Sequence, residues 1–124
     1  METHITREYL RENRTEIFVF GDNDLRKGNG GAAVLRDEPN TYGFITKKFP
    51  KYADDAYYRV TEYESVYRHE INKLKVLLER HKDKIYLISK LGAGLANKYG
   101  IWEQVIEPQL RNDLKNYTNV KFLW

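Results

Sequence analysis

Two glycine-rich segments, Gly21–Gly31 and Lys90–Gly100, hold seven of the eight glycines in this chain of 124 residues. Each segment directly follows an apolar run that predicts a buried strand. Because glycine has no Cβ, backbone N–H groups in such segments can turn inward and approach an anion closely. The two segments therefore predict a phosphate or pyrophosphate site, with purely structural turns as the alternative.

Polar side chains open the first segment, where Asp22 and Asn23 could hydrogen-bond a ribose hydroxyl or the amine of a base. Such side chains also cap turns and helix starts, so a structural role is equally open. Together with Asp24 they raise the question of magnesium, which needs one or two carboxylates and the oxygens of a phosphate. We expect no bound metal and no cofactor.

Three lysines follow predicted strands and could neutralise a bound phosphate: Lys47, Lys48 and Lys90. Ordinary solvated positions are the alternative for each lysine, and Asn97 and Lys98 in the second segment have the same standing. Several aromatic residues flank the loops and could stack on a base, namely Tyr42, Phe44, Tyr99 and Trp102.

The sequence offers little for catalysis. His4, His69 and His81 lie away from the glycine segments, and local spacing assembles no Ser/His/Asp or Cys/His arrangement. No Gly-Lys-Ser/Thr follows the glycines, so they are not a P-loop, and they lack the spacing and the acidic residue of a dinucleotide fingerprint. The residues favour holding a nucleotide over breaking one.

The elements that must position these residues alternate between helix and strand. Tyr63, Tyr67, Ile71, Leu74 and Leu78 form a stripe at the helical period, behind a capping box made by Thr61 and Glu64. The predicted strands are 16–20, 43–46, 57–60, 84–89 and 120–124. The other predicted helices run from Thr3 to about Arg11, from Ala32, and from Trp102 to Leu114 with a late start or kink at Pro108.

This alternation predicts an α/β fold, with helices on both faces of a mixed, mainly parallel sheet in a single domain over residues 1–124. Right-handed crossovers then place both glycine segments at one edge of the sheet, where ligands of open α/β sheets bind.

Composition narrows the class of protein. The chain has no cysteine, a formal net charge of +3 and no block of five like charges. No apolar stretch approaches the length of a membrane span or a signal peptide. We therefore expect a cytoplasmic protein that binds neither membranes nor long nucleic acid, and leave its oligomeric state open.

The stretch from Val19 to Ala33 resembles the first ligand loop of macro domains, which bind ADP-ribose. Leu25 and the glycines at 28, 30 and 31 match the family pattern, whereas Asp22 takes the place of its asparagine. Ile88–Ala96 is similar to the second macro loop without its aromatic residue and closing glycine. Closer still, FGDN, GGAA, RDEPNTYGFITKK, KLGAGLANKYGIWE and NVKFLW resemble a group of small phage and bacterial macro-like proteins.

The resemblance implies a three-layer α/β/α macro-like domain that binds ADP-ribose or a related, cyclic nucleotide, in the host cytoplasm if the protein is phage-encoded. A phage protein of this kind could sequester a nucleotide signal of host immunity. The expected ligand-binding residues are Gly21, Asp22, Asn23, Gly28, Asn29, Gly30, Gly31, Ala32, Lys47, Lys90, Gly92, Ala93, Gly94, Leu95 and Asn97.

Two alternatives to binding without turnover stay open. One is a hydrolase acting on an ADP-ribose derivative or an ADP-ribosylated substrate, with Asp22 as general base or water-orienting group. The other is a protein-interaction domain with a vestigial pocket.

Overall fold

Four parallel strands form the central sheet in the order β2-β1-β3-β4. The computed structural model describes residues 4–124, and the strands are β1 (Glu16–Asn23), β2 (Thr41–Lys47), β3 (Ile85–Ile88) and β4 (Val120–Phe122). The predicted α/β fold is confirmed. Antiparallel pairing is limited, in residues 4–124, to one isolated bridge between Lys47 and Tyr57.

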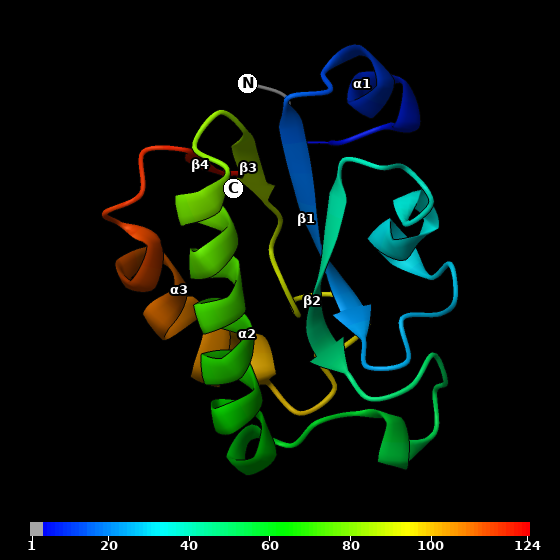
Figure 1. The fold of residues 1–124 in the computed structure, drawn as a ribbon. Coiled ribbons are helices and arrows are strands. Elements are labelled where there is room, and N and C mark those ends of the chain that lie inside the picture. Colours follow the sequence, from blue (N-terminus) through cyan, green and yellow to red (C-terminus); the bar gives the residue numbers. More distant parts are fainter. Residues whose placement is uncertain (1–3) are drawn as a thin grey trace.

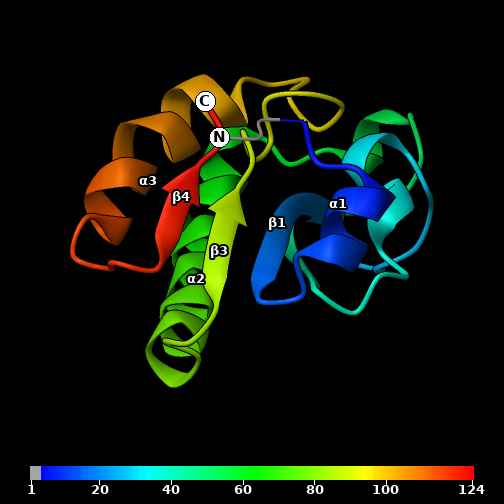
Figure 2. The same cartoon turned by 90° about the horizontal axis from the view of Figure 1, so that it is seen from above.

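Helices cover both faces of this sheet (Figures 1 and 2). The long helix α2 (Val60–Arg80) and the C-terminal helix α3 (Glu107–Leu114) lie on one face, and α1 (Arg7–Glu12) lies on the other. Alternate side chains of β1 point to opposite faces of the sheet. Val19 packs into the core under α2 and α3, whereas Phe18 and Phe20 pack with α1.

The predicted stripe on α2 is confirmed, since Tyr63, Tyr67, Ile71, Leu74 and Leu78 are all fully buried. The predicted capping box is wrong, because α2 begins at Val60, one residue before Thr61. The carboxylate of Glu62 accepts hydrogen bonds from the Arg59 backbone N–H and from the Lys48 ammonium. A local cap from Glu62 to Arg59 N therefore marks the start of the helix, and Lys48 binds the same carboxylate.

The predicted strand at residues 57–60 does not form, because side chains of α2 occupy the outer edge of β2. The buried carboxylate of Glu70 accepts a hydrogen bond from Ile45 N at 2.7 Å, and the Tyr63 hydroxyl donates to Ile45 O. With its edge groups taken, β2 pairs with the following segment only through the bridge to Tyr57.

The strand boundaries also differ from the prediction. Strand β1 continues three residues past Phe20, because Gly21, Asp22 and Asn23 pair with β2. Strand β2 begins at Thr41, inside the predicted turn, and β4 ends at Phe122.

The remaining helices differ from their predicted forms. Thr3 lies outside the described residues; α1 begins at Arg7, and the Thr6 hydroxyl accepts from Tyr9 N. The segment after the first loop is a short 3-10 helix, η1 (Gly31–Leu35). The helix over residues 102–114 forms, with a π-helical turn, η3 (Trp102–Ile106), directly before α3 in place of the predicted late start or kink; Pro108, which has no N–H to donate, lies in the first turn of α3.

Within residues 4–124 no helix is both long enough and apolar enough to span a bilayer.

Replacing Leu74 with alanine tests the α2 interface. Leu74→Ala should lower the free energy of unfolding by about 2–5 kcal/mol, because it opens a cavity between α2 and the sheet. Val76→Ala on the exposed side of the same helix should change it by less than about 0.5 kcal/mol. Urea unfolding of both variants measures the difference, and equal losses would contradict the assigned faces.

Candidate functional site

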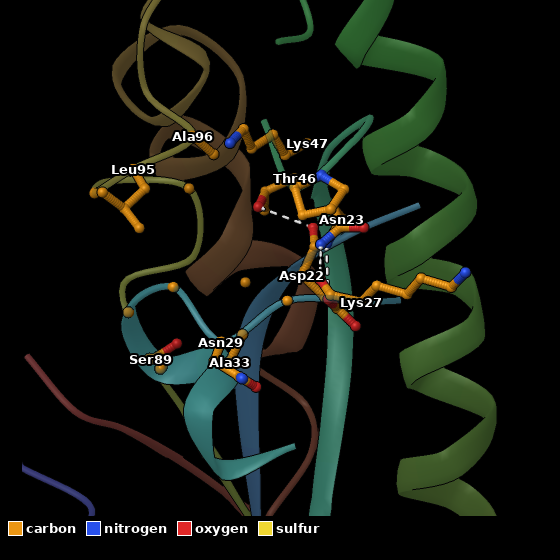
Figure 3. A pocket seen from close by; sticks show the side chains of 18 of the residues that line it. Asp22, Asn23, Lys27, Asn29, Ala33, Thr46, Lys47, Ser89, Leu95 and Ala96 are labelled. Carbon is orange, nitrogen blue, oxygen red and sulfur yellow. Dashed lines mark hydrogen bonds between the residues drawn. The ribbon is translucent and has the colours of Figure 1, made fainter. Parts of the chain in front are cut away.

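A cavity of about 360 Å³ lies at the carboxyl edge of the sheet, where the two glycine segments meet. Its walls include the ends of β1 and β2, the first loop (residues 24–30) and the second loop (residues 89–100), as Figure 3 shows from close by. The predicted meeting of both segments at one edge is therefore confirmed in the geometry.

Most of the predicted site residues line this cavity. They are Gly21, Asp22, Asn23, Gly28, Asn29, Gly30, Gly31, Ala32, Lys47, Lys90, Gly92, Gly94 and Leu95. Ala93 and Asn97 do not line it, and the lining residues that the sequence did not indicate are Lys27, Ala33, Thr46, Pro50, Tyr52, Ser89 and Ala96.

The glycines let the walls approach one another. A Cβ on Gly21 would lie 3.1 Å from the Thr46 hydroxyl and 3.6 Å from Gly92 N, so β1, β2 and the second loop meet here without room for a side chain. Among residues 4–124, the backbone N–H groups of Gly31, Ala32, Gly94 and Leu95 find no hydrogen-bond acceptor. These lining donors are therefore free for a ligand or water.

The Asp22 carboxylate holds the first loop in place. Its side chain is only 2% exposed, and it accepts hydrogen bonds from Asn23 N at 2.8 Å and Arg36 Nη1 at 2.7 Å. Arg26 Nη1 lies 3.4 Å from Asp22 Oδ2, the oxygen that also binds Arg36. Arg36 also donates to the carbonyls of Lys27 and Gly28, so the ion pair ties β1 to the loop.

Asn23 is engaged in the same way. Its Oδ1 accepts from Leu25 N at 3.1 Å, and its Nδ2 donates to the Lys27 carbonyl at 2.6 Å. These contacts favour the structural alternative for both polar residues: they shape the loop that surrounds the cavity.

Lys47 is the unusual group of the site. It is 9% exposed, yet its ammonium forms no ion pair and no hydrogen bond with any residue in the described part of the chain. Instead Nζ lies 4.8 Å from the ring centroids of both Tyr52 and Tyr57. Burial lowers the pKa of this ammonium below its ordinary value, because it has lost water without gaining a counter-ion.

The other lysines of the prediction have ordinary surroundings. Lys48 pairs with Glu62, and Lys98 pairs with Asp54. Lys90 lines the cavity from an exposed position, with Nζ 5.6 Å from the Trp102 ring. In Figure 3 the Lys47 side chain runs toward the side of the cavity where Ala96 lies, whereas Lys27 extends away from it.

Asn97 has a structural contact instead of a place at the site. Its Oδ1 accepts from Trp102 N at 3.1 Å and its Nδ2 donates to Glu103 at 2.8 Å, so it caps the turn that leads into η3. Ala93 packs against the core under α2.

The predicted aromatic residues do not reach the cavity either. Phe44 and Trp102 are buried in the core, Tyr42 packs against that core, and the Tyr99 hydroxyl donates to Asp54. Tyr52 is the aromatic residue on the cavity wall.

A third wall comes from residues 48–56, which we name the strap. Pro50 sits against Gly28, where a Cβ would lie 2.9 Å from the proline Cβ and where the backbone φ is +90°. At the other end Asp54 binds Lys98 and Tyr99 of the second loop. The strap therefore bridges the two loops, and it includes the short 3-10 helix η2 (Asp54–Ala56).

Groups for metal or acid–base chemistry are sparse around the cavity. Residues 4–124 contain no cluster of three or more His, Cys, Asp or Glu side chains arranged to hold a metal ion. Of the titratable groups that line the cavity, Asp22 is the one acid, and the histidines at 4, 69 and 81 are absent from the lining.

Removing the Arg36 side chain tests whether the ion pair supports the loop. Arg36→Ala should lower the free energy of unfolding by about 1–3 kcal/mol, because the buried Asp22 carboxylate loses a hydrogen-bonded partner. Faster amide hydrogen exchange should appear in residues 24–30 and not in α3. Arg14→Ala, at an exposed arginine, is the control and should change neither quantity; an unchanged loop in Arg36→Ala would contradict the assignment.

Comparison with known proteins gives one family. A family profile described as "Family of unknown function (DUF7831)" matches residues 1–98, which include β1, β2, α2, β3 and every residue that lines the cavity. No curated protein and no solved structure matches the chain.

Proposed function

This chain belongs to the family of unknown function DUF7831, and we propose that its cavity binds a nucleotide. The proposed ligand carries phosphate, is ADP-ribose or a related cyclic nucleotide, and lies between the first loop, the second loop and the strap. The likeness of the two loops to macro-domain loops is what suggests the ADP-ribose class.

The unpaired ammonium of Lys47 is the observation that carries the proposal. Most of the Lys47 side chain is buried, but its ammonium is not one of the fully buried polar atoms without a partner, so it keeps access to the cavity that it lines. The ammonium has lost part of its water, and its contacts with two tyrosine rings offset only part of that loss. A phosphate oxygen would supply the missing counter-ion. An anionic ligand is therefore the occupant that the electrostatics of this cavity favour.

The other walls fit the same ligand. Free backbone N–H groups of Gly31, Ala32, Gly94 and Leu95 line the cavity from two sides. Its volume of about 360 Å³ falls within the range of small-molecule sites, and its place at the carboxyl edge of parallel strands is where open α/β sheets bind ligands.

Binding without turnover is the form of the proposal that these contacts support. The hydrolase alternative needs Asp22 to accept a proton or orient water, but Arg36, Arg26 and Asn23 N already occupy this carboxylate. Sequestration of a nucleotide signal, in the cytoplasm and by a phage protein, is the physiological role that the macro-like resemblance adds.

Substituting Lys47 tests the proposal directly. Lys47→Met should weaken ADP-ribose binding about ten- to a hundred-fold, because it removes a charge-assisted hydrogen bond of about 1.5–3 kcal/mol. Its melting temperature should stay close to that of the wild type, because the ammonium forms no ion pair or hydrogen bond within the described residues whose loss would destabilise the fold. Isothermal calorimetry measures the affinity, with Lys82→Met, at an exposed lysine outside the cavity, as control.

The pH dependence of ADP-ribose affinity provides a second test of Lys47. Because burial lowers the pKa of Lys47, this side chain loses its proton at a lower pH than an ordinary lysine. The affinity of the wild type for ADP-ribose should therefore fall at alkaline pH, whereas that of Lys47→Arg should stay level. Full affinity in Lys47→Met would reject the role assigned to Lys47, and absence of ADP-ribose binding to the wild type would reject the proposed function.

Identifying the ligand that the protein releases on heating distinguishes sequestration from hydrolysis. The protein is saturated with ADP-ribose or cyclic ADP-ribose, freed of excess ligand, denatured by heat, and the released small molecule is identified by mass spectrometry. Because Asp22 is held by two arginines, the ligand should be recovered intact. Product in excess over protein would instead establish turnover.

A further inference from the structure

The strap carries an exposed aromatic ring onto the cavity. Tyr52 is 73% exposed and still lines the cavity wall, whereas tyrosines of the core such as Tyr63 and Tyr67 are fully buried. Its one interaction within residues 4–124 is the contact of its ring with the Lys47 ammonium. Packing into the core therefore does not explain why a large aromatic side chain lies here.

The backbone on both sides of Tyr52 is nevertheless held. Two residues earlier, Pro50 packs on Gly28 of the first loop, in a contact that leaves no room for a Cβ. Two residues later, Asp54 binds Lys98 and Tyr99 of the second loop. The ring is thus presented from an anchored segment, so little ordering is needed when a ligand binds.

A second exposed apolar side chain lies on the cavity wall. Leu95 is half exposed and reaches from the second loop to the first, where its Cδ1 would lie 3.2 Å from a Cβ on Gly30. The cavity therefore combines two kinds of surface. Lys47 and the free backbone N–H groups suit phosphate, whereas Tyr52 and Leu95 suit a flat, uncharged ring.

We infer that Tyr52 is a specificity-determining residue that stacks on the aromatic base of the ligand. This inference rests on the proposed nucleotide binding, and adds to it that the base is recognised at the strap. The Lys47 ammonium against the Tyr52 ring places the phosphate-binding charge and the stacking ring side by side. A ligand that carries phosphate without a base would gain from the charge alone.

Two probes and two variants test this inference. ADP-ribose carries the base, and ribose 5-phosphate shares the phosphorylated ribose without it. Tyr52→Leu, which keeps the apolar bulk and loses the ring, should weaken ADP-ribose binding about ten-fold and leave ribose 5-phosphate unchanged. Tyr52→Phe keeps the ring and is the matched control, with affinity for both probes as in the wild type. Calorimetry measures all six combinations.

The outcomes separate this inference from the proposed function. Wild-type binding of ADP-ribose with no loss in Tyr52→Leu would overturn the role of Tyr52 and leave nucleotide binding standing. An equal loss for both probes would overturn base stacking, because the ring would then serve the phosphate through Lys47. Binding of neither probe to the wild type would overturn the proposed function and this inference together. Because Tyr52 is exposed, the variants should keep the wild-type melting temperature.

Discussion

The ion pair between Asp22 and Arg36 is the constraint on which the rest of the site depends. Asp22 is the penultimate residue of β1, and its Oδ2 occupies the space that a Cβ on Gly43 of β2 would need. Arg36 neutralises this carboxylate and donates to two carbonyls of the first loop. One of them belongs to Gly28, on which Pro50 of the strap packs. Strand, loop and strap are therefore positioned through one buried charge pair.

That arrangement also sets the electrostatics of the cavity. With Asp22 neutralised by Arg26 of the first loop and by Arg36 after η1, no acid of the described lining is left to balance the lysines. Lys90 is exposed, whereas the ammonium of Lys47 lies against the rings of Tyr52 and Tyr57 and is partly removed from water. A partly desolvated cation without a counter-ion is a local cost, and such costs concentrate where a ligand supplies the missing interaction.

Elements governed by local pattern were predictable from the sequence, whereas boundaries governed by long-range contacts were not. The periodicity of α2 and the apolar runs of β1 and β3 depend on neighbours along the chain. The start of α2 was misplaced because Glu62, whose carboxylate also binds Lys48 of the strap, caps the helix at Arg59 N in place of the predicted pair Thr61 and Glu64. Residues 57–60 stayed out of the sheet because Glu70 and Tyr63 already cover β2. In the first case a local cap and a contact with the strap share one carboxylate, and in the second a distant segment supplies the hydrogen bonds.

The candidate site divides along the same line. Glycines mark backbone approach wherever they occur, so the two loops could be placed from sequence. The roles of side chains depend on their contacts in the folded chain. The sequence left Asp22 and Asn23 open between binding a ligand and shaping a turn, and only the hydrogen bonds of the folded loop favour the second role. Lys47 and Lys48 are adjacent in sequence and equivalent by type, yet Lys48 pairs with Glu62 whereas the ammonium of Lys47 lies against the rings of residues 52 and 57 at the cavity. Because the ring of Tyr52 reaches Lys47 only when the strap crosses between the loops, these surroundings exist only in the assembled fold.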